Sequence, residues 1–172
     1  SSPTFTPRDF ESQPEFLRTS LGADSSLKKL RDRTAEQRDL RTVYRTITRA
    51  DQAVGEVLAA LERLELDDNT IVIFTSDHGN LLGDHGLWGK WLMYENSIRV
   101  PFIVYDPRIE PARVARRPKE MALNIDLAPT ILALAGVEAP DAMQGRNLLP
   151  VIRREAVEWR THFYYEHVYN TD

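Results

Sequence analysis

The sequence predicts an α/β fold in which helices pack on a mixed, mostly parallel sheet. Two short apolar runs, residues 70–75 and 101–105, are rich in β-branched and aromatic residues, which is typical of strands buried in a parallel sheet. A long amphipathic pattern over residues 34–64 precedes the first run. A shorter apolar pattern over residues 126–135 follows the second and indicates a helix that Gly136 ends.

The long amphipathic pattern is the clearest helix signal in the chain. Residues 34–37 read Thr-Ala-Glu-Gln, a candidate capping box with Thr34 as the N-cap and Gln37 at the third helical position. Apolar residues then recur at steps of three and four on one face. The helix is expected to end before the polar turn Asp67-Asp68-Asn69.

The two ends of the chain carry weaker patterns. Residues 1–33 are rich in Ser, Pro, Thr and charge, and we expect a partly ordered connector with one short helical turn around residues 14–21. From about residue 140 a Pro- and Gly-bearing connector leads to a short helix near residues 148–158. A strand is then expected over residues 161–166.

Composition excludes several classes of function. The 172 residues are 42% hydrophobic and 28% charged, which is typical of a globular protein, and the net charge of −4 leaves no basic footprint for nucleic acid. The absence of Cys excludes disulfides, thiolate catalysis and zinc–thiolate sites within this sequence. No apolar run reaches the length of a membrane span. We therefore expect neither a nucleic-acid partner nor a membrane segment.

Chemistry is concentrated directly after the first predicted strand. Asp77 and His78 follow its C-terminal end, where open α/β sheets bind ligands, and the fourteen residues 77–90 hold two Asp, two His and one Lys. Glycines at 79, 83, 86 and 89 permit tight turns and close approach to a ligand. A carboxylate beside an imidazole is a plausible half of a metal site. The alternatives are an Asp that shapes a turn and a His that hydrogen-bonds a loop carbonyl.

These residues carry a resemblance to a known family. Over about residues 40–150 the chain resembles the sulfatases, within the alkaline phosphatase superfamily. The matching motifs occur in the family's order: Asn69-Thr70, Ser76-Asp77-His78-Gly79, Gly83-Asp84-His85-Gly86, Lys90, Tyr94–Pro101, Asp126–Thr130 and Leu134–Val137.

The resemblance implies an alkaline-phosphatase-like fold and a division of the chain. Residues 1–33 are expected as the connector, 34–139 as the C-terminal half of the catalytic α/β domain, and 140–172 as the start of a smaller C-terminal α+β subdomain. Sulfatases carry a formylglycine nucleophile, made from Cys or Ser in a C/S-x-P-x-R motif. The nearest match here, residues 1–5, has Phe where the motif has Arg. We therefore expect the nucleophile and the remaining metal ligands to lie in a preceding half, and the isolated chain to be inactive.

The resemblance also assigns roles within the site. Asp77 and His78 match metal ligands, and Ca²⁺ is the first expectation, with Mn²⁺ or Mg²⁺ as alternatives. Lys90 matches the lysine that contacts sulfate; its alternative is an ordinary surface lysine. His85 either donates a proton or contacts substrate, or only braces the loop.

Two further residues of these motifs are expected to be structural. Glu95 and Arg99 stand at i,i+4 and suit an ion pair. Asp126 is expected to cap the helix that follows it.

The expected function is hydrolysis of a sulfuric ester on a small molecule or carbohydrate. One alternative is a phosphonate monoester or phosphodiester hydrolase of the same superfamily, which the run from Gly83 to Lys90 also resembles. A second is a non-catalytic metal-binding or interaction module. The oligomeric state stays open. The location stays open as well, either cytoplasmic or periplasmic/secreted.

Overall fold

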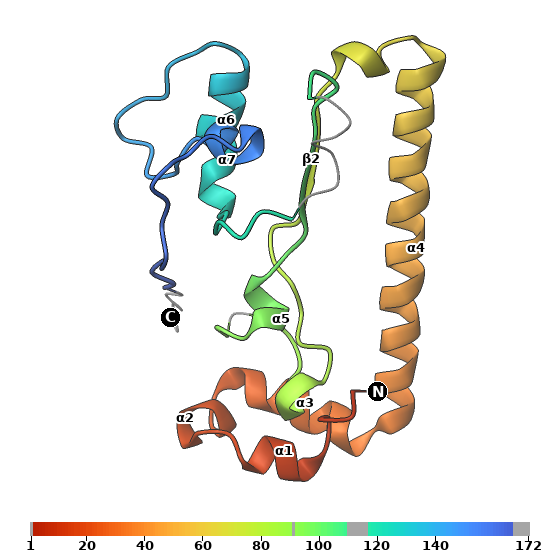
Figure 1. Cartoon of the computed structure of the whole chain (residues 1–172). Coiled ribbons are helices and arrows are strands. Elements are labelled where there is room, and N and C mark those ends of the chain that lie inside the picture. Colours follow the sequence, from red (N-terminus) through yellow and green to blue (C-terminus); the bar gives the residue numbers. More distant parts are fainter. Residues whose placement is uncertain (1, 91, 110–116, 167–172) are drawn as a thin grey trace. The chain divides into compact units, whose positions relative to one another are not determined.

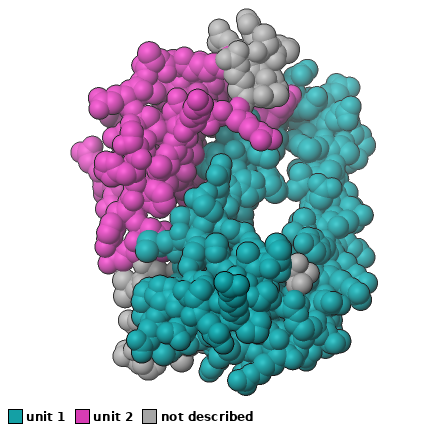
Figure 2. Space-filling model, turned by 60° about the horizontal axis from the view of Figure 1, so that its bottom comes forward, with its two compact units in different colours: residues 1–104 teal, residues 105–172 magenta. Residues whose placement is uncertain are grey.

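The computed structural model describes residues 2–90, 92–109 and 117–166. The chain forms two compact units, residues 1–104 and 105–172 (Figure 2). They are described one at a time below. The domain boundaries expected at residues 33 and 139 stay a prediction.

The long helix is confirmed as α4, Arg33–Arg63 (Figure 1). Its cap differs from the expected one: Asp32 is the N-cap, and its carboxylate accepts a hydrogen bond from the Ala35 backbone N–H at 2.9 Å. The predicted Thr34 cap is wrong because the helix starts two residues earlier than that cap implies, which places Thr34 inside its first turn.

The first 33 residues are far more ordered than expected. They fold into α1 (Pro7–Glu11), α2 (Glu15–Arg18) and α3 (Leu21–Arg31). Thr6 caps α1 through its hydroxyl, which accepts from the Asp9 backbone N–H at 3.2 Å. The helical turn expected around residues 14–21 is present as α2, but the expectation missed α1 and α3 on either side of it. Helices as short as α1 and α2 show no periodic pattern of their own.

A small apolar core explains why these short helices hold together. Phe10, Leu17 and Ala23 come from α1, α2 and α3, and they pack with the buried Leu81 and Leu87 of the loop that follows the first strand. Isolated helices of four to eleven residues are marginal in water, so their order depends on this packing. The N-terminal segment and the loop therefore support each other.

The two predicted strands are present and pair in a two-stranded sheet. They are β1, Val72–Thr75, and β2, Phe102–Tyr105. Their side chains are less buried than expected: Phe74 is 42% exposed and Ile103 is 58% exposed. The described residues supply only this pair of strands, so the sheet is not buried on both of its faces.

The apolar face of α4 is exposed as well. Tyr44, Ile47 and Leu58 are among its accessible apolar side chains, between 46% and 64% exposed. A helix face and strands of this kind are the surfaces that a larger α/β domain buries.

The single turn expected after Tyr94 is α5, Glu95–Ile98, and the predicted Glu95–Arg99 ion pair is confirmed at 3.1 Å.

The second unit is built around a buried carboxylate. A 3-10 turn, Asn124–Asp126, leads into α6, Leu127–Leu134, and a short helix α7, Leu149–Arg153, packs against α6. Asp126 has no exposed side-chain surface. It accepts hydrogen bonds from the backbone N–H groups of Leu123 and Arg146 and from two nitrogens of Arg160.

Asp126 occupies the N-cap position of α6, as predicted, but its side chain makes no capping hydrogen bond to that helix. Its carboxylate is turned instead toward three other segments of the unit.

The helix predicted over residues 148–158 is present only over its first half, as α7, and residues 161–166 form no strand. Among the described residues, no helix is both long and apolar enough to cross a bilayer.

Candidate functional site

Asp77 lies in the turn that leaves β1. The backbone N–H of His78 donates to Asp77 Oδ1 at 2.9 Å, and the Ser76 hydroxyl donates to the His78 carbonyl at 3.1 Å. The backbone hydrogen bond from His78 lowers the pKa of the Asp77 carboxyl, and the charges of His78 and Lys90 act in the same direction against slight desolvation. With its side chain 83% exposed, Asp77 presents an ionised carboxylate to whatever approaches the end of the strand.

The contacts of His78 fix its tautomer. Its Nδ1 lies 2.9 Å from the carbonyl oxygen of Gly79. A carbonyl oxygen only accepts hydrogen bonds, so Nδ1 carries a proton; an ammonium only donates them, so Nε2 meets Lys90 Nζ with its lone pair. This is the arrangement of a metal-binding imidazole, in which the second nitrogen is held by a hydrogen bond. The expected alternative, a His bonded to a loop carbonyl, is thus compatible with a ligand role.

A cation is needed where these two side chains meet. His78 Nε2 lies 3.4 Å from Asp77 Oδ2, and two lone-pair-bearing atoms at that distance repel each other unless a positive charge stands beside them. In this chain the charge comes from Lys90, whose Nζ lies 2.5 Å from His78 Nε2. The donor set, one carboxylate oxygen and one imidazole nitrogen, fits a divalent cation.

The glycine-rich loop folds back on itself and so brings Lys90 to His78. The Leu81 N–H donates to the Gly89 carbonyl at 2.7 Å, and the Gly83 N–H donates to the Leu87 carbonyl at 2.9 Å. Leu81 and Leu87 anchor the loop in the apolar core. The chain therefore returns to its starting point twelve residues after His78.

Gly79 is required by a close backbone approach. Its N–H donates to the Ser97 carbonyl at 2.8 Å. A Cβ at position 79 would lie 2.0 Å from the Asn96 carbonyl oxygen, which the backbone of α5 leaves no room to avoid. Any larger residue would push the Asp77–His78 turn away from α5.

Asp84 lies at the centre of a second cluster in the same loop. Its carboxylate accepts hydrogen bonds from the Ser2 hydroxyl, from the Thr4 hydroxyl at 3.4 Å, and from the Asn96 side-chain amide. Asn96 and its neighbour Ser97 thereby tie the Asp84 turn and the Asp77–His78 turn to the same end of α5. The N-terminal segment closes the cluster from the other side.

His85 is braced by that cluster. Its ring stacks on Tyr94 with 4.4 Å between ring centroids and 21° between planes. The Tyr94 hydroxyl donates to Gln13 Oε1 at 2.6 Å, and Gln13 Nε2 donates to the His85 carbonyl at 3.1 Å. The ring remains accessible, so bracing and substrate contact are both open to it.

The structure thus brings three of the four predicted site residues together. Asp77 and Lys90 each lie close to His78 Nε2, and His85 belongs to the adjoining Asp84 cluster. Among the described residues no group of three or more His, Cys, Asp or Glu side chains is placed to hold a metal ion. By themselves Asp77 and His78 therefore do not make up a complete metal site, and their role as ligands stays a prediction.

The sequence carries no signal for the N-terminal part of this site. Thr4 and Ser2 reach Asp84 across 80 and 82 residues of chain, and Gln13 reaches Tyr94 across 81. Single short polar residues in a Ser- and Pro-rich segment have no periodicity to mark them.

Comparison with known proteins gives one consistent family. A family model described as Sulfatase matches residues 4–137. The chain is 37% identical over 134 residues to an N-acetylglucosamine-6-O-sulfatase of Bacteroides thetaiotaomicron, covering 76% of this chain and 24% of that protein. The family match begins inside the segment expected as a connector, which agrees with the helices found there.

Solved structures extend the comparison. One, described as a complex with its substrate D-glucosamine-2-N,6-O-disulfate, matches with a TM-score of 0.68 and 29% identity over 95% of this chain and 35% of that one. A phosphonate monoester hydrolase from Silicibacter pomeroyi matches with a TM-score of 0.57 and 39% identity over 64% of this chain and 21% of that one. The chain spans about a fifth to a third of the length of these proteins.

Proposed function

This chain belongs to the sulfatase family of the alkaline phosphatase superfamily, and from that premise we propose that the full-length protein hydrolyses a sulfuric ester. The predicted α/β, alkaline-phosphatase-like fold is confirmed by the same matches. The observation that carries the proposal is the contact of Lys90 with the Asp77–His78 pair at the end of β1.

Each of the three residues has a task in that reaction. Asp77, ionised and exposed, and His78, with its Nε2 lone pair directed outward, are proposed to hold a divalent cation. The sulfatase family generally uses such a metal, and when bound it would draw charge from the sulfate oxygens. Lys90 is proposed to bind the sulfate group, because an ammonium is a compact charge with three donors.

The Lys90 contact supports this division of work. Without a divalent ion the ammonium neutralises the Asp77–His78 pair. A divalent cation held by Asp77 and His78 would supply that positive charge instead, and the Lys90 ammonium would then be available to donate hydrogen bonds to the sulfate of the substrate. Ca²⁺ is the metal we propose first, because that is what the resemblance to the sulfatases implies; Mn²⁺, which the His78 imidazole also suits, and Mg²⁺ are the alternatives.

His85 is proposed as the second group that faces the reacting ester. Its stack on Tyr94 leaves the imidazole edge accessible for a hydrogen bond or a proton to the leaving oxygen. The nucleophile is proposed to be a formylglycine outside these 172 residues, since the sequence has no Cys and no C/S-x-P-x-R motif. The isolated chain should therefore show no turnover.

The proposed substrate is a sulfated sugar. The name of the Bacteroides thetaiotaomicron relative specifies an N-acetylglucosamine 6-O-sulfate, and the solved structure that matches 95% of this chain is described as a complex with a glucosamine disulfate. Steady-state hydrolysis of 4-nitrophenyl sulfate and of N-acetylglucosamine 6-sulfate by the full-length protein tests the proposal. We expect turnover of both, with the sugar preferred. Full-length protein loaded with metal that turned over neither ester would contradict it.

A second function is kept because one comparison favours it. The phosphonate monoester hydrolase structure has the higher sequence identity of the two solved structures described, 39% against 29%, although over less of the chain. Phosphonate monoesters and phosphodiesters carry fewer negative charges than phosphate monoesters and resemble sulfate esters in shape. Comparing kcat/KM for 4-nitrophenyl sulfate and for the phosphonate monoester 4-nitrophenyl phenylphosphonate decides which ester is preferred.

A further inference from the structure

A basic stripe runs along α4 on the side opposite its apolar face. Arg38, Arg41, Arg45 and Arg49 recur at steps of three and four, which places them on one side of the helix. Ile47, at about half a turn from that line, marks the apolar side. We call these four arginines the arginine stripe.

The arginine stripe lacks internal neutralisation. In the described part of the chain no acidic side chain forms an ion pair with Arg41, Arg45 or Arg49, and Arg38 has only a loose contact of 3.7 Å from Nε to Asp39. Like charges at i,i+4, as in Arg41–Arg45 and Arg45–Arg49, destabilise a helix. A surface arranged in this way is suited to an anion that comes from outside it.

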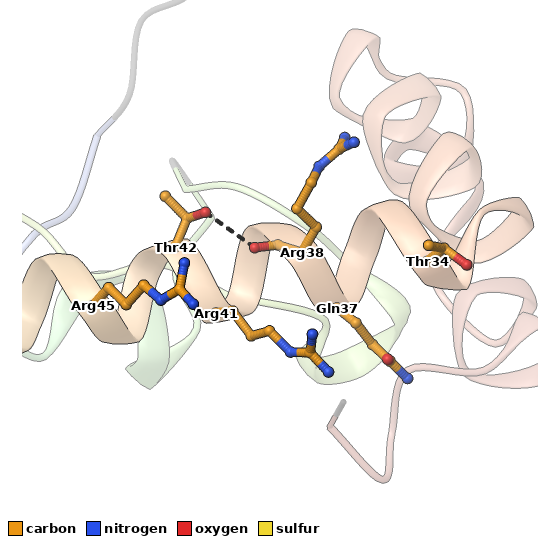
Figure 3. Close-up of a pocket in the computed structure, with 6 residues that line it drawn as sticks. All are labelled: Thr34, Gln37, Arg38, Arg41, Thr42 and Arg45. Carbon is orange, nitrogen blue, oxygen red and sulfur yellow. Dashed lines mark hydrogen bonds between the residues drawn. The ribbon is translucent and has the colours of Figure 1, made fainter.

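The first part of the stripe borders a shallow hollow of about 230 Å³. Figure 3 shows the Arg41 and Arg45 side chains reaching along the helix in the same direction, toward Gln37. Two guanidinium groups and a side-chain amide thus offer several N–H donors to one volume. The lining residues are Thr34, Gln37, Arg38, Arg41, Thr42 and Arg45.

This donor set fits a sulfate group. A guanidinium presents its N–H groups as a planar fork that matches two oxygens of a tetrahedral oxyanion, and it is more weakly hydrated than an ammonium. From Arg41 to Arg49 the stripe extends about 12 Å along the helix axis. That length exceeds a single sulfate, so the ligand it fits is an extended one with several charges.

The helix α3 links the start of α4 to the glycine-rich loop that follows β1. Lys29 of α3 forms an ion pair with Asp39 of α4, and its ammonium also lies 5.1 Å from the ring centroid of Trp88 in the loop. The Ser26 hydroxyl of α3 accepts a hydrogen bond from the backbone N–H of Trp88 at 2.9 Å. The hollow therefore begins near the loop that carries His85 and Lys90, within the same compact unit.

We propose that the arginine stripe is a secondary binding surface for a sulfated polysaccharide, separate from the catalytic site, and that it holds sulfate groups on sugars other than the one being cleaved. The proposal rests on the sulfatase function proposed above. It predicts that the enzyme binds sulfated chains more tightly than short sulfated sugars, and that this preference weakens with salt.

Binding of fluorescein-labelled dextran sulfate to the full-length protein, followed by anisotropy from low to high NaCl, tests the proposal. The double variant Arg41→Gln/Arg45→Gln is expected to bind at least about tenfold more weakly at low salt, with a smaller slope of log Kd against log[NaCl], because fewer counterions are released. The matched control is Arg8→Gln/Arg63→Gln, which removes the same charge from exposed sites off the hollow and is expected to bind like the wild type.

Three results would overturn the proposal. Equal weakening in the two double variants would mean that only net charge matters. Wild-type affinity in Arg41→Gln/Arg45→Gln with a lower melting temperature would mean that another part of the full-length protein covers the stripe. Equally tight binding of a single-stranded DNA of matched length and charge would exclude a saccharide site. Hydrolysis of 4-nitrophenyl sulfate is measured separately, so loss of the proposed function and loss of this surface are distinguishable.

Discussion

Two aspartates in family motifs, Asp77 and Asp126, occupy opposite environments. Asp77 is 83% exposed and accepts a hydrogen bond from the neighbouring His78 N–H. Asp126 is fully buried and accepts from two backbone N–H groups and a guanidinium. Buried charges are stable only when fully paired, whereas an exposed carboxylate is accessible to a ligand. Burial thus separates a structural aspartate from one suited to bind a ligand.

The largest effect that this comparison predicts is on catalysis at Asp77. In the full-length protein Asp77→Asn is expected to lower kcat/KM for 4-nitrophenyl sulfate by about a thousandfold or more, because the metal loses an anionic ligand. Chemical denaturation is expected to change little, since the side chain is exposed. Asp68→Asn, another exposed aspartate of the same unit, is the control and should retain activity.

Asp126 is expected to show the reverse pattern. Asp126→Asn leaves the Arg160 guanidinium, whose side chain is only 10% exposed, without its carboxylate partner. Breaking a buried ion pair costs about 3–5 kcal/mol, so the free energy of unfolding should fall by that order. Urea denaturation measures it, with Asp141→Asn on the exposed connector as the control. An Asp126→Asn protein of wild-type stability would refute the division between the two aspartates.

Asp106 offers an intermediate case with a pH signature. Arg108 donates to both carboxylate oxygens, at 2.8 and 2.7 Å, and lowers the pKa of Asp106. A lowered folded-state pKa stabilises the protein above the unfolded pKa of about 4, and the stabilisation is lost as pH falls through the folded value. Arg108 is 56% exposed, so we expect Asp106→Asn to cost about 1 kcal/mol at pH 7.

That cost should begin to shrink as pH falls below about 4, where the unfolded carboxyl takes up a proton, and should vanish only once pH falls through the lowered pKa of the folded carboxyl. Urea denaturation at pH 7 and at pH 3 measures it in both proteins. Glu138→Gln, which removes an exposed carboxylate, should show no such pH-dependent difference. A stability gap that is the same at both pH values would show that charge on Asp106 plays no part.

The smallest effect is expected at Tyr94. Tyr94→Phe keeps the ring stacked on His85 and removes only the hydroxyl bonded to Gln13. One neutral hydrogen bond contributes about 1 kcal/mol, so kcat should fall less than tenfold while KM stays close to the wild type. Tyr94→Leu, which also removes the stack, should lower activity further. Equal activity in both variants would show that Tyr94 does not position His85.

Local patterns made the long helix, both strands and the Asp77–His78 turn predictable. α4 shows eight turns of periodicity, and the strands are dense in β-branched residues. The order of residues 1–33 was not predictable, because Phe10 and Leu17 find their apolar partners in a loop some seventy residues later. The strand expected over residues 161–166 failed because β-propensity depends on a neighbouring strand.

The same limit applies within the site. Spacing alone placed Asp77, His78 and Lys90 in one loop, but their mutual contact depends on the backbone pairing of Leu81 with Gly89. The environment of Asp84 depends on Thr4 and Ser2, far away in sequence. Asp126 looked like a helix cap because its sequence position is that of one, and only the fold shows its carboxylate turned toward Arg160.

The central claim is that Asp77 and His78 each coordinate a divalent cation through one atom at the end of β1. A crystal structure of the full-length protein soaked in Mn²⁺, with anomalous data, tests it directly. We predict one anomalous peak within coordination distance, about 2.0–2.6 Å, of both an Asp77 carboxylate oxygen and His78 Nε2, with Lys90 Nζ moved away from the imidazole. A peak that contacts neither residue, or Lys90 still bonded to His78 in the metal-loaded enzyme, would contradict the account.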